Sequence, residues 1–322
     1  MTVSLQRAQI ETTSVCNQRC SFCPVSVKRR KKSTLDLAQL KRILEQLNQH
    51  PISTIYLNGF NEPTYDKEII EKIALIHDYG YSVSFLSNGS GLTPDLVEQL
   101  FSLGVMNYCV NLSTIDLDQY QTTRGNSDII KVLPNVEFLL NRCVQEDAHA
   151  TILIVGNLDE THADNIQQIH SHFNQYLNNN NVISICPAVD YAANLTEIRP
   201  DNFYHKTLRG CANKRHKEWL HISAAGNLIL CCHDYEEKYA FSHIESEQLE
   251  SAFANPTYQQ FSRWVEGEEE APEDFICRYC LFAISDDDFM ARINERFCSN
   301  CVLPKQLKND LDACSYCEVK KQ

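Results

Sequence analysis

The sequence predicts an α/β protein in which a parallel sheet is followed by a smaller, cysteine-rich domain. Strand-like and amphipathic helix-like segments alternate through residues 1–190, which gives six β/α repeats. Such alternation is typical of a parallel sheet, because helical crossovers join its strands. After Arg199-Pro200 the pattern changes to short segments with turns and cysteines. We therefore expect two domains, residues 1–199 and residues 200–322.

Six short runs rich in β-branched and other apolar residues predict the strands. They are Leu5–Thr12, Thr54–Asn58, Ser82–Leu86, Asn107–Leu112, Ala150–Val155 and Val182–Cys186. The sheet that they form is either open or curled into a partial barrel. Because parallel strands end at one edge, we expect the loops that follow them to share a rim.

Amphipathic stretches between these strands predict the helices. They are Leu37–Leu47, Asp66–Tyr79, Pro94–Leu103, Ile129–Cys143 and Ala163–Leu177. Thr93 before Pro94 is typical of an N-cap followed by proline at the first helical position.

Composition excludes several classes of function. The chain has 322 residues and a formal net charge of −13, which disfavours indiscriminate binding to nucleic acid. It shows no secretory signal and no apolar run long enough to span a membrane, so we expect a cytoplasmic protein. The 15 cysteines of so long a chain indicate metal or redox chemistry rather than a disulfide scaffold.

The cysteines follow a pattern. Cys16, Cys20 and Cys23 have the spacing CxxxCxxC, directly after the first predicted strand. Thiolate-rich sites favour zinc or iron–sulfur clusters. Three cysteines in one short loop leave one iron of a [4Fe–4S] cluster without a protein ligand, and that iron is open to a small molecule.

The segment Cys16–Cys23, preceded by Glu11-Thr12-Thr13, resembles the signature of radical S-adenosylmethionine (radical SAM) enzymes. The resemblance implies a partial (β/α)6 TIM barrel and a [4Fe–4S] cluster whose unique iron is chelated by S-adenosylmethionine (SAM). It also implies reductive cleavage of SAM to a 5′-deoxyadenosyl radical, which abstracts hydrogen from a substrate.

Further positions resemble the SAM-binding elements of this family. The segment Gly59-Phe60-Asn61-Glu62-Pro63 is similar to the GGEP element that holds the SAM amino group, with Asn61 in place of a glycine. Ser87 and Asn88 resemble a T-N-G segment near the SAM pocket. By the same resemblance Ser113 contacts the ribose and Arg124 pairs with the SAM carboxylate. Ser87, Ser113 and Arg124 taken singly are also consistent with ordinary loop residues.

The second domain resembles the SPASM/twitch extension of the family. Cys211, Cys231, Cys277 and Cys280 match the four ligands of one auxiliary [4Fe–4S] cluster, although Cys232 is an alternative to Cys231. The chain departs from the full SPASM spacing after Cys280. Two further pairs, Cys298/Cys301 and Cys314/Cys317, form another four-thiolate set, which fits a second auxiliary [4Fe–4S] cluster or a zinc knuckle.

The resemblance implies several substrate classes. The first is a ribosomally synthesised precursor peptide, modified by crosslinking, epimerisation or backbone excision. We expect a separate leader-peptide recognition protein, because no winged-helix-like segment precedes the barrel, and an electron donor of the flavodoxin or ferredoxin type. The alternatives are a small-molecule (amino sugar or nucleoside) dehydrogenase or decarboxylase and, of another class, a non-enzymatic metal-binding protein.

Some residues have two interpretations. Cys186, at the end of the sixth strand, is a hydrogen-atom donor for an epimerase or a buried small hydrophobic residue. Cys109 and Cys143 are expected in the core. The basic run Lys28–Lys32 is a solvated loop or a docking patch for an acidic peptide or partner.

Overall fold

A computed structural model describes residues 3–156, 160–195 and 204–286. Within these ranges the chain forms two compact units, which we describe separately. Unit 1 comprises residues 3–17, 23–83, 189–195 and 204–286, and unit 2 comprises residues 18–22, 84–156 and 160–188. The predicted domain boundary at residue 199 lies outside the described residues, so it stays a prediction.

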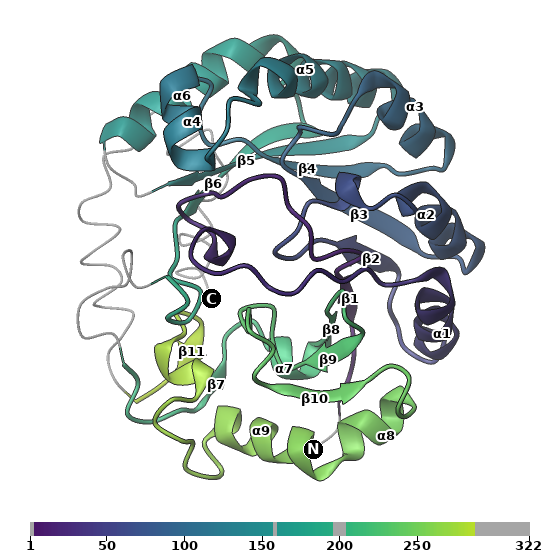
Figure 1. Cartoon of the computed structure of the whole chain (residues 1–322), viewed down its shortest axis with the longest axis vertical. Helices are drawn as coiled ribbons and strands as arrows, with labels where there is room; N and C mark the ends of the chain where they lie inside the picture. Colours follow the sequence, from purple (N-terminus) through teal and green to yellow (C-terminus); the bar gives the residue numbers. More distant parts are fainter. Residues whose placement is uncertain (1–2, 157–159, 196–203, 287–322) are drawn as a thin grey trace. The chain divides into compact units, whose positions relative to one another are not determined.

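Unit 1 begins with two β/α repeats (Figure 1). Its elements before residue 84 are β1 (Arg7–Ile10), η1 (Pro24–Ser26), α1 (Leu37–Leu47), β2 (Thr54–Leu57), η2 (Pro63–Tyr65), α2 (Ile69–Asp78) and the first residues of β3 (Ser82–Ser87). Strands β1 and β2 are parallel, with Ala8 opposite Ile55. Helix α1 spans the predicted residues, and the side chain of Asp36 caps its first turn by accepting a hydrogen bond from Gln39 N.

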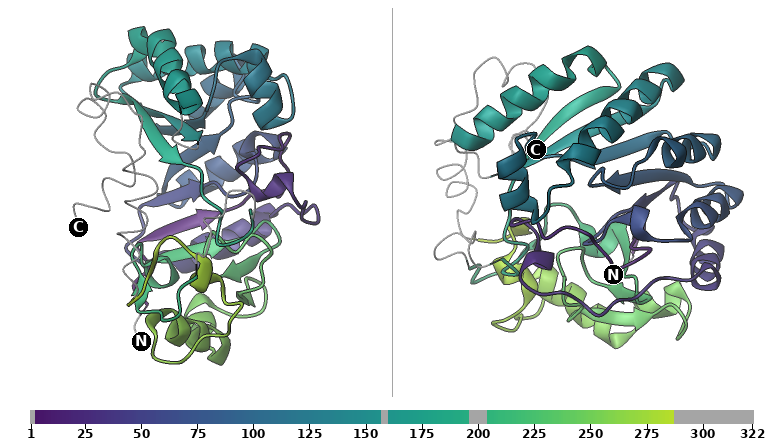
Figure 2. Two further views of the ribbon diagram at one scale, coloured as in Figure 1. Left: turned by 90° about the vertical axis from the view of Figure 1, so that its left-hand side faces the viewer. Right: turned by 45° about the horizontal axis from the view of Figure 1, so that its top comes forward.

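The C-terminal part of unit 1 is built from short strands and helices (Figure 2). Its elements are β7 (Gly210–Cys211), α7 (Arg215–Glu218), β8 (Trp219–Ile222), β9 (Asn227–Ile229), β10 (Ala240–His243), α8 (Leu249–Ala254), α9 (Pro256–Glu266), η5 (Ile276–Tyr279) and β11 (Ala283–Ile284). Strand β8 pairs in parallel with β1, and β9 pairs antiparallel with both β8 and β10. Strands β7 and β11 form a separate two-stranded ribbon that brings Cys211 opposite Ala283.

Unit 2 contains the remaining β/α repeats. Its elements are the rest of β3, α3 (Pro94–Ser102), β4 (Asn107–Asn111), α4 (Leu117–Arg124), α5 (Ile129–Glu146), β5 (His149–Gly156), α6 (Glu160–Phe173), η3 (Asn174–Tyr176) and β6 (Asn181–Pro187). Strands β3, β4, β5 and β6 pair in that order, and every pair is parallel. Helices α3, α5 and α6 lie along one side of these strands (Figures 1 and 2).

The prediction of an α/β protein with a mostly parallel sheet is confirmed. The six predicted strands and five predicted helices occur within a few residues of their expected bounds. Thr93 caps α3 through its hydroxyl, which accepts a hydrogen bond from Leu96 N at 3.4 Å. Helix α4 was not predicted, because its sequence is polar on all sides and carries no apolar periodicity. No helix in the described ranges is long and apolar enough to cross a membrane.

Candidate active site and metal centres

The loop that carries the predicted cluster ligands follows β1 and extends to η1. Cys16, Cys20 and Cys23 are all partly exposed, and none of the described cysteines forms a disulfide bond. Cys16 and Cys23 belong to unit 1, whereas Cys20 belongs to unit 2. Their surroundings are therefore given unit by unit.

In unit 1, the loop after β2 is fastened to a buried carboxylate at the end of β1. Glu11 is only 5% exposed, and its Oε1 accepts a hydrogen bond from the backbone N of Phe60 at 2.7 Å. Arg30 donates to both oxygens of the same carboxylate, at 2.6 and 2.9 Å. A Cβ at Gly59 would lie 2.2 Å from Cγ of Glu11, so only glycine fits beside this carboxylate.

The next residues of this loop are tied to the chain just before Cys16. Glu62 N donates to the carbonyl oxygen of Val15 at 2.9 Å, and the Glu62 side chain, 1% exposed, accepts from Thr64 N and Oγ1. Both side-chain amide atoms of Asn61 are buried without a hydrogen-bond partner among the described residues. Burying an amide without hydrogen-bond partners costs free energy of folding. The Asn61 side chain therefore suits a position at which a polar ligand binds.

In unit 2, a buried arginine links Cys20 with the end of β4. Arg124 is the last residue of α4 and is 1% exposed. Its Nη2 donates to Oδ1 of Asn111 at 2.8 Å and to Oγ of Ser113 at 3.1 Å. Its Nη1 lies 3.7 Å from Sγ of Cys20. The predicted residues Cys20, Ser113 and Arg124 are thus neighbours.

Other residues of the cysteine loop hold this arginine in place. Gln18 accepts from Arg124 Nη1 at 3.2 Å and donates to the hydroxyl of Tyr120 at 2.7 Å. The rings of Phe22 and Tyr120 lie 5.0 and 5.6 Å from the guanidinium carbon. Arg124 Nε has no hydrogen-bond partner in the described residues. The guanidinium therefore keeps donor capacity for a ligand carboxylate.

Ser87 and Asn88 shape the turn after β3. Ser87 Oγ accepts from Gly89 N at 3.0 Å, and Asn88 Oδ1 accepts from Ser90 N and Oγ at 3.0 and 2.7 Å. Gly89 has φ +83°, and a Cβ there would crowd Val132 at 3.0 Å. These contacts order the turn after β3.

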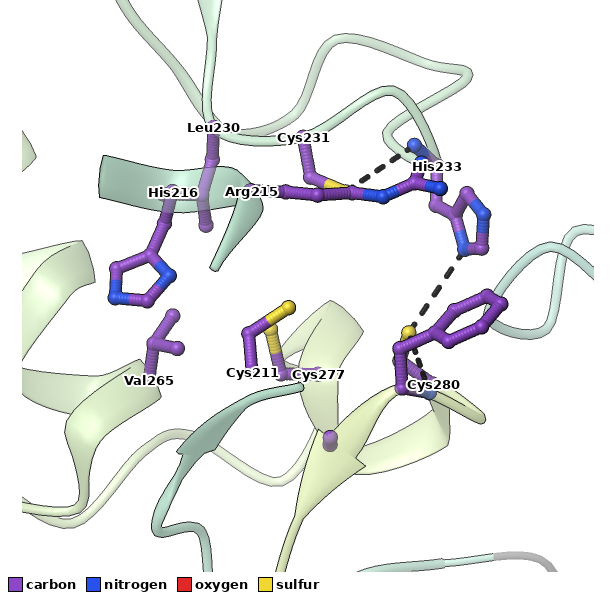
Figure 3. Close-up of a pocket in the computed structure, with 11 residues that line it drawn as sticks. Cys211, Arg215, His216, Leu230, Cys231, His233, Val265, Cys277 and Cys280 are labelled. Atoms are coloured by element: carbon purple, nitrogen blue, oxygen red, sulfur yellow. Dashed lines mark hydrogen bonds between the residues drawn. The ribbon is translucent and has the colours of Figure 1, made fainter. Parts of the chain in front are cut away.

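The four predicted ligands of the auxiliary cluster line one small cavity of unit 1 (Figure 3). Cys211 comes from β7, Cys231 follows β9, Cys277 lies within η5, and Cys280 directly follows η5. Burial raises the pKa of Cys211, Cys277 and Cys280, so uncompensated thiolates are disfavoured there. No three metal-ligating side chains in the described ranges meet at the point of a single ion. Four thiols spread around a cavity suit a multinuclear cluster, whose charge stabilises thiolates.

One half-buried cation accompanies these thiols. Arg215 of α7 contacts Sγ of Cys232, and its guanidinium carbon lies 5.5 Å from the Phe282 ring. In Figure 3 it crosses the cavity beside Cys231. His233 lies next to the guanidinium end of Arg215 in the same view, with its Nδ1 3.8 Å from Sγ of Cys280. Cys232 is thus engaged with an arginine, whereas Cys231 lines the cavity.

The remaining described cysteines lie in unit 2. Burial, with a contribution from Cys186, raises the pKa of Cys109 to about 12, and burial likewise raises the pKa of Cys143 to about 12. Both are neutral thiols, and Cys143 is buried whereas Cys109 is partly exposed. Cys186 lies in β6 opposite Val155 and is partly exposed. The last four cysteines, Cys298, Cys301, Cys314 and Cys317, lie outside the described residues.

Sequence reasoning missed several residues that organise these sites. They are Glu11, Gln18, Arg30, Asn111, Tyr120 and Arg215. Glu11 and Asn111 could have been found as polar residues at the carboxyl ends of strands of a parallel sheet, where ligand sites form. Arg30 and Arg215 carry no such signal, because their partners are distant in sequence.

Comparison with known proteins places the chain in a class. Residues 10–168 match the family model of the radical SAM superfamily, and residues 211–281 match SPASM, an iron–sulfur cluster-binding domain. This chain belongs to the radical SAM superfamily and carries a SPASM domain. The predicted resemblance is confirmed.

The curated relatives match only in part. The chain is 28% identical over 129 residues to a probable GTP 3′,8-cyclase of Pyrococcus abyssi, and this match covers 40% of the chain and 42% of the relative. It is 23% identical over 160 residues to the sporulation killing factor maturation protein SkfB of Bacillus subtilis, covering 50% and 37%. The chain thus spans about half or less of these relatives.

Solved structures match over more of the chain. SuiB of Streptococcus suis, solved with its precursor peptide SuiA, has a TM-score of 0.66 at 12% identity, covering 84% of this chain and 74% of SuiB. anSMEcpe with bound AdoMet has a TM-score of 0.63 at 13% identity, covering 94% and 98%. BtrN in complex with AdoMet and 2-DOIA has a TM-score of 0.56 at 17% identity, covering 83% and 90%. These similarities confirm the predicted fold class.

Proposed function

We propose that this protein is a radical SAM enzyme that modifies a ribosomally synthesised precursor peptide. The observation that carries the enzyme assignment is the buried Arg124, which contacts Cys20 and Ser113 and keeps an unpartnered Nε. A guanidinium with an unpartnered N–H suits the carboxylate of a bound cofactor, which arginine binds through charge-assisted hydrogen bonds.

Each predicted site residue has a proposed role. Cys16, Cys20 and Cys23 hold a [4Fe–4S] cluster that, with SAM bound and an electron supplied, provides a 5′-deoxyadenosyl radical for hydrogen abstraction. Arg124 orients the SAM carboxylate, and Glu62 and Asn61 with the backbone of Gly59 and Phe60 hold its amino group. Ser113 lies at the ribose, and Ser87 and Asn88 shape the nearby turn. Phe22 excludes water from the cluster.

The auxiliary site has a proposed ligand set. Cys211, Cys231, Cys277 and Cys280 hold one auxiliary [4Fe–4S] cluster, and Cys232 is held by Arg215 instead. Cys298, Cys301, Cys314 and Cys317 would bind a second cluster or zinc. Iron and zinc contents of purified protein, before and after a Cys298→Ala/Cys301→Ala change, separate these two alternatives.

A peptide substrate is favoured by the relatives. SuiB was solved bound to a precursor peptide, and SkfB and MftC are named for maturation of a killing factor and of mycofactocin. We propose the same substrate class here, with a separate leader-recognition protein and a flavodoxin- or ferredoxin-type electron donor in the cytoplasm. Affinity capture on a candidate precursor peptide tests this part. Absence of peptide binding, with and without the leader-recognition protein, would refute it.

The enzyme assignment has its own test. Reconstituted protein should form 5′-deoxyadenosine from SAM when reduced with dithionite, and Cys20→Ala should abolish this product. Cys109→Ala, which removes a thiol outside the proposed ligand sets, is the matched control. Activity that survives in Cys20→Ala would exclude the assignment.

A small molecule is the second candidate substrate. BtrN was solved with 2-DOIA, and several curated relatives are probable GTP 3′,8-cyclases. Dehydrogenation or decarboxylation of an amino sugar or nucleoside is the corresponding activity. Turnover of such a compound, together with no affinity for any precursor peptide, would favour this candidate.

A further inference from the structure

The basic run that follows the cysteine loop is only partly neutralised. Lys28 is paired with Glu236, and Arg30 is paired with Glu11 and Glu237. Arg29, Lys31 and Lys32 are exposed, and no described carboxylate lies within 4.0 Å of them. Three cations without a carboxylate partner among the described residues thus lie within four positions of a chain whose formal charge is −13.

The loop that carries these cations is anchored at several points. The carbonyl oxygen of Lys28 accepts a hydrogen bond from the Tyr235 hydroxyl, and that of Lys31 accepts one from Ser14 Oγ at 3.1 Å. Ser33 exchanges backbone and hydroxyl bonds with Ser14 at 2.9 to 3.0 Å. An anchored loop presents its side chains with less loss of conformational entropy on binding.

A cavity of about 750 Å³ lies beside this loop, within unit 1. Its walls include the whole basic run, Ala224 and Ala225 of the β8–β9 turn, and the segment Tyr235–Glu237. The volume is in the range of pockets that enclose drug-sized ligands, or a few residues of a peptide. The lining has five basic side chains and two acidic ones, so its charge is net positive.

We propose that this cavity, which we call the basic groove, binds an acidic segment of the precursor peptide. The proposal rests on the peptide substrate proposed above and adds the place and the chemistry of its recognition. Arg29, Lys31 and Lys32 would pair with carboxylates of the segment, while the exposed Ala225 would contact its apolar atoms.

The shape of the groove favours a peptide over a globular acidic partner. An extended peptide segment can place single side chains into the groove. The convex surface of a folded electron donor could contact only the exposed ends of Arg29, Lys31 and Lys32. Nucleic acid is disfavoured because the chain as a whole is acidic, with a formal net charge of −13.

Arg30 connects the basic groove to the loop proposed to hold SAM. Its guanidinium carbon lies 5.0 Å from the Tyr235 ring and 5.8 Å from the Phe60 ring. The same guanidinium binds Glu11, which accepts the Phe60 N–H. A peptide carboxylate that competes for Arg30 would therefore weaken the contact between Arg30 and Glu11, and with it the support of the Gly59–Glu62 segment.

The test measures peptide binding separately from catalysis. A fluorescein-labelled peptide of alternating glutamate and alanine is titrated with the full reconstituted protein by anisotropy, with a glutamine–alanine peptide as the neutral probe. The triple variant Arg29→Glu/Lys31→Glu/Lys32→Glu should bind the acidic probe about tenfold more weakly or worse. The control Lys41→Glu/Lys67→Glu/Lys131→Glu makes the same change of charge at other exposed lysines and should bind like the parent protein.

Several outcomes would overturn the proposal. The first is equal affinity of the parent protein for the two probes, and the second is equal affinity of the two triple variants for the acidic probe. The third comes from a separate measurement of cluster reduction by flavodoxin, if the groove variant loses this reduction and keeps its peptide affinity. The last result would assign the basic run to the electron donor. SAM cleavage with dithionite should persist in both triple variants. Its absence from the parent protein would refute the proposed activity without bearing on the groove.

Discussion

A Cβ on Gly59 would lie 2.2 Å from Cγ of Glu11, which is closer than any two such atoms approach in a folded protein. The loop after β2 therefore rests directly on the carboxylate that ends β1. Because Glu11 also binds Phe60 N and Arg30, this contact sets the position of the segment that continues to Glu62.

Gly59→Ala should displace Glu11 and shift the loop. We expect a loss of about 1–3 kcal/mol of stability and a clear loss of SAM affinity, since overpacking next to a buried ion pair cannot relax locally. Urea unfolding and calorimetric titration with SAM measure the two effects. Gly80→Ala, where a Cβ meets open space but φ is +83°, should cost stability and leave SAM affinity intact. Equal SAM affinity in both variants would contradict the proposal that the contact between Gly59 and Glu11 positions this loop for SAM binding.

Arg124→Lys should weaken SAM binding by about tenfold or more. A lysine ammonium cannot replace the guanidinium that reaches Asn111, Ser113 and the Cys20 sulfur together. The same change at Arg142, a half-buried arginine of α5 paired with Glu98, is the matched control and should bind SAM normally. Normal SAM affinity in Arg124→Lys would remove this arginine from the site.

Asn61→Ala should separate stability from SAM binding. Its amide atoms are buried without partners, so their removal should leave the free energy of unfolding of the SAM-free protein unchanged or higher. Affinity for SAM should fall, because the amide is proposed to bind it. A variant that loses stability and retains SAM affinity would show that the amide serves the fold alone.

Arg215→Gln should lower the reduction potential of the auxiliary cluster by tens of millivolts. Removing a half-buried cation beside Cys232 disfavours the added electron, and about 59 mV corresponds to a tenfold change in the equilibrium of a one-electron couple. A redox titration followed by EPR measures the potential. Arg215→Lys keeps the charge and should shift it less. Identical potentials in the three proteins would show that the arginine does not tune the cluster.

Cys186→Ala tests whether this thiol donates hydrogen to a substrate radical. If the reaction is an epimerisation, the variant should form 5′-deoxyadenosine normally and incorporate no deuterium from D₂O into the peptide. Mass spectrometry of the product peptide measures the incorporation. Normal incorporation would exclude Cys186 as the donor and leave it as a small residue of β6.

Much of the candidate site was accessible from local sequence patterns. The β/α alternation predicts the strands because each strand buries apolar residues over a short, contiguous run. The spacing of Cys16, Cys20 and Cys23 and of the later CxxC pairs predicts their joint use as metal ligands, since the members of each set lie close together in the sequence. Helix α4, which carries Arg124, was not predicted because its sequence has no apolar periodicity. Packing and the Asp116 cap stabilise it instead.

The sequence by itself determined the α/β class, the radical SAM signature and the cysteines available to each metal centre, because these depend on local spacing. Tertiary structure alone decided that Glu11 supports Gly59 and Phe60, that Arg124 reaches Cys20, and that Arg215 engages Cys232. It also decided which cations of the run Lys28–Lys32 are paired, because the carboxylate partners of Lys28 and Arg30 include residues more than 200 positions away. Such pairings depend on how the chain folds back on itself, and neither composition nor periodicity records that.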